Sequence, residues 1–282
     1  MPSPGPDAAR LAEVYRLALG ERRNRGPAGE RLGKGTGASL EFQDRRLYAP
    51  GDDVRHLDWA AYARTDQMLV RLYREEVLPT VELLVDCSLS MAVDPDKAQL
   101  TADLAGMLIA CCRADGYHVR PILLGDRPQV ASLERIEKEG FRFEGRSPLT
   151  AGVQEALALL RPGSIRVLLS DFLIPHDPAQ LLRPLAGRAG DLILLQVLGA
   201  EDVDPIEGEA LRLEDVESGE SIDLVLDRGT VDGYRERLRN LQDGLALEVR
   251  RAGGRYVSVT AGTGLEELCR GRLAREGILV PA

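Results

Sequence analysis

The 282-residue chain has little of what a membrane or secreted protein needs. No apolar run approaches the ~20 residues that span a bilayer. Residues 1–6 lack the basic and apolar regions of a secretory signal peptide. We therefore expect a cytoplasmic protein with no membrane span. A composition of 44% hydrophobic and 29% charged residues is typical of a folded protein with one large domain or two small ones.

Positive charge, cysteine and histidine are also scarce. The chain has 36 lysines and arginines against 45 acidic residues, a net charge of −9, which argues against a nucleic-acid binder. Its four cysteines form no Cys-x-x-Cys pair, so neither a zinc site nor a disulfide framework is indicated. The three histidines lack metal-ligand spacing. Neither a phosphate-binding glycine loop nor a Gly-x-Ser-x-Gly elbow is found.

From residue 80 onward, short apolar runs alternate with amphipathic segments. We expect strands over 81–85, 119–124, 165–169 and 192–198, and helices over 97–113, 150–160 and 178–188. Apolar runs without alternation are typical of buried parallel strands, and their order predicts an α/β fold with a mainly parallel sheet covered by helices on both faces. After Gly199 we expect a hairpin, a long helix, and a last strand and helix.

The first 79 residues have a different character. Residues 7–25 predict a charged helix, and residues 26–37, with five glycines, predict a flexible linker. Residues 39–79 contain five of the chain's twelve aromatic residues between two strand-like ends. We therefore expect three parts: an N-terminal helix and linker (1–37), a β-rich extension (38–79) and an α/β domain (80–282).

Hard oxygen ligands follow two of the predicted strands. Asp86, Ser88 and Ser90 form an Asp-x-Ser-x-Ser pattern directly after the first core strand, and Asp171 follows the third. Thr150 stands at the start of a predicted helix. In open α/β sheets, ligands bind outside the carboxyl ends of the strands, and such oxygens suit Mg2+ or Mn2+. A plainer interpretation also fits, since Asp and Ser satisfy loop backbone groups and Thr caps helices.

This constellation resembles the metal-ion-dependent adhesion site of von Willebrand factor A domains. The resemblance implies one divalent ion, with Asp86, Ser88 and Ser90 as the first motif, Thr150 as the second and Asp171 as the third. It also implies a Rossmann-like, von Willebrand A-type sheet. Adhesion domains usually place glycine after the third-motif Asp, whereas Phe172 stands here.

A second motif lies upstream, within residues 41–59. Its charged and aromatic members are Arg45, Arg46, Asp52, Asp53, Arg55, Asp58 and Trp59. With residues 71–76 and the Asp-x-Ser-x-Ser loop, it resembles the signature of a bacterial family called "domain of unknown function 58". The resemblance covers roughly residues 33–175 and implies a von Willebrand A-like domain. Many members have transmembrane helices before the signature, so this chain looks like a short form without them.

Two roles for the upstream cluster stay open. Its charges could form an ion-pair network that fixes the extension onto the core, with Trp59 as an anchor. Alternatively, the cluster could dock a partner or cover the metal site.

Our leading interpretation is a binding module and not an enzyme, and we assign no catalytic residues. Family members are often encoded beside MoxR-type AAA+ ATPases, which suggests a chaperone-like or assembly role. An acidic side chain of such an ATPase, or of its client, would complete the coordination of Mg2+ or Mn2+, because neutral serines leave positive charge on the ion. Two alternatives remain: Mg-dependent phosphoryl transfer through Asp86, which needs an acid where Ser88 stands, and a structural interaction protein with an empty site.

Overall fold

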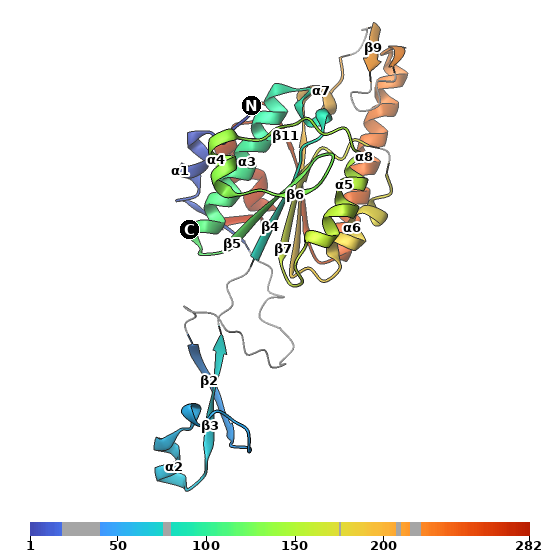
Figure 1. The fold of residues 1–282 in the computed structure, drawn as a ribbon. Helices are drawn as coiled ribbons and strands as arrows, with labels where there is room; N and C mark the ends of the chain where they lie inside the picture. The colour runs from blue at the N-terminus through green and yellow to red at the C-terminus, as the bar shows by residue number, and fades with distance from the viewer. Residues whose placement is uncertain (19–39, 76–79, 175, 207–209, 215–220) are drawn as a thin grey trace. The chain divides into compact units, whose positions relative to one another are not determined.

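The computed structural model describes residues 1–18, 40–75, 80–174, 176–206, 210–214 and 221–282 (Figure 1). The chain forms two compact units. Met1–Arg25 and Pro79–Ala282 together make one, which we call the sheet unit, and Gly26–Leu78 makes the other, the signature unit. The expected three-part division at residues 37 and 79 stays a prediction.

Six strands form the sheet of the sheet unit. Their spatial order is β11 (Arg255–Thr260), β8 (Asp191–Leu198), β7 (Ile165–Ser170), β4 (Thr80–Asp86), β5 (His118–Leu124) and β6 (Gln129–Val130). The first five run parallel to one another, and β6 pairs antiparallel with β5. The prediction of a mainly parallel α/β sheet is therefore confirmed.

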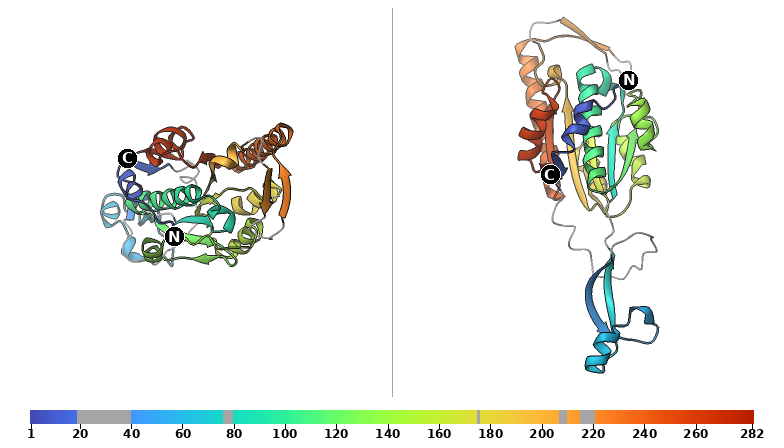
Figure 2. Two further views of the ribbon diagram at one scale, coloured as in Figure 1. Left: turned by 90° about the horizontal axis from the view of Figure 1, so that it is seen from above. Right: turned by 90° about the vertical axis from the view of Figure 1, so that its left-hand side faces the viewer.

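Helices cover both faces of this sheet (Figures 1 and 2). One face carries α1 (Pro6–Leu11), α3 (Pro95–Ala114), α4 (Leu133–Glu139) and α9 (Leu265–Leu268), and the other carries α5 (Leu149–Ala156), α6 (Pro178–Ala186) and α8 (Arg228–Arg251). Strand β4 shows why its sequence lacks alternation. Leu83 and Val85 pack into one core and Leu84 into the other, because successive strand side chains point to opposite faces.

The N-terminal segment differs from the helix expected over residues 7–25 in its described part, residues 7–18, and the rest of that helix lies outside the described residues. Helix α1 ends at Leu11, and β1 (Tyr15–Leu17) pairs antiparallel with β12 (Leu279–Pro281), near the other end of the chain. Leu11 on the helix and Leu17 on the strand are both buried. The apolar residues of this segment therefore fit a short helix followed by a strand as well as one continuous helix. Pairing with a strand more than 250 residues away decided between them, which local propensity cannot do.

The signature unit contains an antiparallel pair, β2 (Leu40–Leu47) and β3 (Leu69–Glu75), with α2 (Trp59–Thr65) between them in the chain. In the sheet unit, α7 (Ala200–Val203) follows β8, and β9 (Ala210–Glu214) pairs with β10 (Ser221–Val225). Among the described helices, none is both long enough and apolar enough to cross a membrane.

Candidate functional site

Asp86 ends β4 at the edge of the sheet where the parallel strands finish, which we call the carboxyl edge. Its Oδ2 accepts the hydroxyl hydrogen of Ser170 at 2.6 Å, and its Oδ1 accepts the backbone N–H of Ser88 at 3.0 Å. Burial first, and then the charge of Asp171, raise the pKa of Asp86 to about 6, although these hydrogen bonds oppose the rise. No described basic side chain forms a salt bridge with Asp86, so the buried carboxylate lacks direct charge compensation.

The two serines of the motif lie together. The hydroxyl oxygens of Ser88 and Ser90 are 2.9 Å apart, with Ser88 buried and Ser90 half-buried. Gly145 holds this loop: its carbonyl accepts the N–H of Leu89 at 2.8 Å, and its N–H donates to the carbonyl of Cys87 at 2.9 Å. A Cβ at Gly145 would lie only 2.9 Å from Gly125 Cα, so the close approach requires glycine.

Thr150 lies five residues beyond this contact. It is half-buried and is the second residue of α5, whose N-cap is Pro148, so Thr150 does not cap the helix. In the described chain, no hydrogen bond joins its hydroxyl to the other four predicted ligands. Thr150 therefore lies at the start of the helix that follows the contact between Gly145 and the serine loop.

Asp171 is buried in the loop after β7, where it contacts Lys97, which is not among the predicted site residues. Lys97 Nζ lies 3.0 Å from Asp171 Oδ2 and 3.0 Å from Asp202 Oδ2, with the lysine side chain only 4% exposed. Burial acts to lower the pKa of Lys97, but the charges of Asp171 and Asp202 outweigh it and the pKa is raised. A signal was present in the sequence, because Lys97 lies on the same helix face as the buried residues Thr101, Leu104 and Leu108.

The carboxyl edge therefore has more carboxylates than cations. Asp171 and Asp202 contact the one ammonium, whereas Asp86 contacts none, so the three carboxylates and one lysine have a net charge of 1 − 3 = −2 when all are ionised. The described residues contain no cluster of three or more His, Cys, Asp or Glu side chains arranged around one metal ion. A cation here would instead be held by Asp86 and Asp171 together with the hydroxyls of Ser88, Ser90 and Thr150 and with water. This donor set fits Mg2+, which usually binds through one or two carboxylates and keeps several waters.

Phe172 follows Asp171 in a strained conformation. Its φ of 58° lies in the left-handed region, which costs a non-glycine residue on the order of 1 kcal/mol. Its ring is fully buried in the core beneath α5 and α6, and this burial offsets the strain. The backbone conformation is therefore one that glycine adopts freely, while the side chain fixes the loop to the core.

In the signature unit, the predicted charged residues pair with one another. Asp58, whose side chain is fully buried, accepts from Arg45 Nε at 2.7 Å and from Arg71 Nη2 at 3.0 Å. Two further pairs within the unit are Arg46–Asp52 and Arg55–Asp53. The hydrogen bond from Arg71, followed by that from the backbone N–H of Ala61, holds the pKa of Asp58 well below its ordinary value. Trp59, the residue after Asp58, is 62% exposed.

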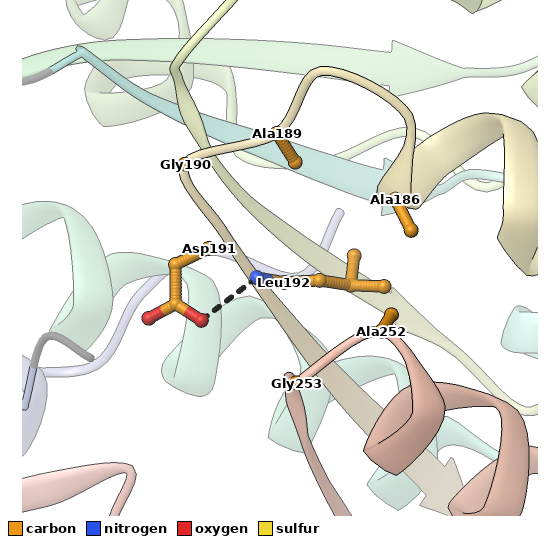
Figure 3. Close-up of a pocket in the computed structure, with 7 residues that line it drawn as sticks. All are labelled: Ala186, Ala189, Gly190, Asp191, Leu192, Ala252 and Gly253. Atoms are coloured by element: carbon orange, nitrogen blue, oxygen red, sulfur yellow. Dashed lines mark hydrogen bonds between the residues drawn. The ribbon is translucent and has the colours of Figure 1, made fainter. Parts of the chain in front are cut away.

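Two small cavities lie at the opposite, amino edge of the sheet. One of about 60 Å³ is bordered by Asp191, Leu192, Ala252 and Gly253, and the Asp191 carboxylate accepts the N–H of Leu192 there at 2.9 Å (Figure 3). The other, of about 150 Å³, is lined in part by Arg166 and Arg188. Neither is bordered by a predicted ligand.

A model of the family described as "Protein of unknown function DUF58" matches residues 44–242. The chain belongs to this family. This DUF58 chain is 28% identical over 248 residues to uncharacterized proteins of Mycobacterium bovis and Mycobacterium tuberculosis, which covers 82% of this chain and 78% of each relative.

Two solved structures show a weak likeness. One is the conserved hypothetical protein BatB from Bacteroides thetaiotaomicron, with a TM-score of 0.39 and 16% identity over 70% of this chain and 96% of that one. The other is an aerotolerance-related membrane protein from Bacteroides fragilis, with a TM-score of 0.39 and 16% identity over 71% of this chain and 98% of that one. A likeness of this size carries no argument about the DUF58 chain.

Proposed function

We propose that this DUF58 protein is a metal-dependent protein–protein interaction module with a von Willebrand A-type sheet. Asp86, Ser88, Ser90, Thr150 and Asp171 would hold Mg2+ or Mn2+ at the carboxyl edge. The excess of buried carboxylate over cation at this edge is the observation that carries the proposal. A divalent ion would neutralise that excess without a closed ring of acidic ligands.

The chain's own residues prepare the site for an ion. Asp86 fixes the backbone of Ser88 through its Oδ1, and Ser170 holds its Oδ2. The paired hydroxyls of Ser88 and Ser90 then present two oxygens side by side. When bound, the ion would supply a coordination position that a carboxylate can fill.

The proposed partner is a MoxR-type AAA+ ATPase, or a client of that ATPase, which docks through an acidic side chain. Val93 supports a docking role for this edge, because it follows the serine loop closely and is 64% exposed. An apolar side chain beside a charged centre is typical of interface patches, in which apolar contact accompanies a specific polar anchor.

A metal titration tests the proposed ion site. Thermal unfolding of the full chain is followed in EDTA and at rising Mg2+ or Mn2+, since a ligand specific to the folded state must raise Tm. We expect Asp86→Asn to abolish that rise. Asp227→Asn is the matched control, because Asp227 caps α8 at an exposed position and asparagine caps helices equally well. A wild-type Tm that does not change with either ion at millimolar concentration would contradict the proposal.

A binding assay tests the docking step separately. The immobilised chain is incubated with a purified MoxR-type ATPase in Mg2+ and in EDTA. We expect the wild-type chain to recover the ATPase in Mg2+ but not in EDTA. The Asp86→Asn and Val93→Asp variants should fail to recover it even in Mg2+. Val93→Asp should still show the Mg2+-dependent Tm rise, which separates docking from ion binding. Equal recovery in Mg2+ and EDTA would show that docking does not depend on the metal.

A further inference from the structure

Lys97 is a buried cation beside the proposed ion site. It is the third residue of α3, which begins at Pro95 after the cap Asp94. Lysine is almost never fully buried unless it is paired, because removing an ammonium from water is costly. Its burial therefore has to be explained by the groups that it contacts.

Those groups are two carboxylates, of which only one belongs to the proposed ion site. Asp171 Oδ2 faces the ammonium at 3.0 Å, while Asp171 Oδ1 accepts the N–H of Leu173 at 3.1 Å. Asp202 Oδ2 faces the same ammonium at 3.0 Å and also accepts the N–H of Gly199 at 2.8 Å. The positive charge of Lys97 is therefore divided between Asp171 and Asp202.

Tight packing holds this arrangement in place. A Cβ at Gly199 would lie 2.5 Å from Asp94 Oδ2 and 3.3 Å from Asp202 Oδ2, so a larger residue here would displace the Asp94 side chain. The backbone carbonyl of Asp202 also accepts the Tyr234 hydroxyl at 2.7 Å, which ties α7 to α8. The hydrogen bonds to Gly199 and Tyr234 hold Asp202 in place beside Lys97.

We propose that Lys97 is a positioning residue that sets the divalent-ion affinity of the carboxyl edge, and that Asp202 limits the effect of Lys97 by pairing with the same ammonium. This inference rests on the proposed function. The ammonium neutralises part of the charge that would attract an ion, and it also restrains Asp171. Asp202 restores negative charge and divides the ammonium between two partners. Lys97 therefore lowers the affinity of the carboxyl edge for a divalent ion, and Asp202 raises it.

Mg2+ and Mn2+ binding to the full chain is measured by calorimetry, and unfolding is measured in EDTA. We expect Lys97→Met to lower Tm in EDTA, because the buried Asp171 and the half-buried Asp202 lose their counter-ion, yet to bind Mg2+ about tenfold more tightly or better. Asp202→Asn should bind Mg2+ several-fold more weakly. Lys97→Arg keeps the charge and should stay within about threefold of wild type. Lys138→Met removes the same charge from an exposed position on α4 and should change nothing.

The outcomes separate this inference from the function on which it rests. If the wild-type chain binds neither ion, both the proposed function and this inference are overturned. If wild type binds Mg2+ but Lys97→Met lowers Tm with unchanged affinity, Lys97 is purely structural and only this inference is overturned. If Lys97→Met does not fold, Asp202→Asn decides, because equal or tighter Mg2+ binding by that variant overturns the opposite-sign effect.

Discussion

Strand β4 carries a buried carboxylate near each end, and the molecule compensates the two in different ways. At the amino edge, Glu82 forms a salt bridge with Arg120 and lies 3.9 Å from Arg166 Nε. Its carboxylate also accepts the Ser164 hydroxyl at 2.6 Å and the Arg161 N–H at 3.0 Å. At the carboxyl edge, Asp86 has hydrogen bonds but, among the described residues, no salt bridge.

The difference separates a structural cluster from a candidate binding site. One carboxylate with two arginines needs no further cation, and Asp58 of the signature unit follows the same rule with Arg45 and Arg71. At the carboxyl edge, the buried Asp86 and Asp171 and the half-buried Asp202 have one lysine among them, and negative charge without a cation is costly where it is desolvated. Burial of charged groups alone therefore does not mark a site, whereas a buried carboxylate without a cation partner does.

The largest effect is expected at the amino edge. Glu82→Gln removes the charge that two buried or half-buried arginines face, and breaking such a pair costs ~3–5 kcal/mol. Urea unfolding of the full chain should show this loss equally in EDTA and in Mg2+. A loss of stability that is smaller in Mg2+ than in EDTA would contradict the distinction between the two edges, because it would connect Glu82 with the ion site.

Asp171→Asn should act in the opposite way, through the ion. At a Mg2+ concentration one hundred times Kd, wild type should gain about 2.7 kcal/mol, or roughly 5–10 °C in Tm. The variant should lose most of this gain, while Lys97 keeps Asp202 as a partner in the metal-free protein. Differential scanning fluorimetry with and without Mg2+ measures both quantities. An undiminished gain would remove Asp171 from the ligand set.

Acid should weaken the signature unit through Asp58. Because the pKa of Asp58 is lowered on folding, the carboxylate stabilises the unit at neutral pH, and this stability is lost as pH falls below the ordinary carboxyl range, near 4. Trp59, the only tryptophan in the chain, lies next to Asp58 and reports the change by fluorescence. Asp58→Asn should flatten the acid transition. A transition of unchanged size in that variant would assign it to another carboxyl group.

The smallest effect is expected for Ser88→Ala. The substitution removes one neutral ligand and its 2.9 Å contact with Ser90, so stability in EDTA should change by only about 1 kcal/mol. Mg2+ affinity, measured by calorimetry, should fall about tenfold if the hydroxyl ligates directly. A loss of stability without a change in affinity would make Ser88 a structural residue of the loop.

Local patterns predicted the sheet well. The apolar run predicted as a strand over 81–85 is β4, and the helix predicted over 97–113 is α3. The pairing of β1 with β12 could not be predicted, because it joins three-residue strands near opposite ends of the chain. Helix α4 was also missed, since a seven-residue helix offers little periodicity.

For the candidate site, the sequence predicted that oxygen ligands gather at the carboxyl edge, but not their charge balance. Ser170 and Asp202 reach Asp86 and Lys97 only through strand register and the position of α7. Lys97 had the one local signal, a lysine on an apolar helix face. Its partners lie 74 and 105 residues away, which no local pattern encodes.

The buried ring of Phe172 has a consequence for the kinetics of docking. Because the ring fixes the loop that carries Asp171, the conformational entropy of that loop is lost during folding and not at the encounter with a partner. A partner that docks here would meet a preorganised surface and associate at a rate set by diffusion and orientation. Differences in affinity among partners would then arise in how long each complex lasts.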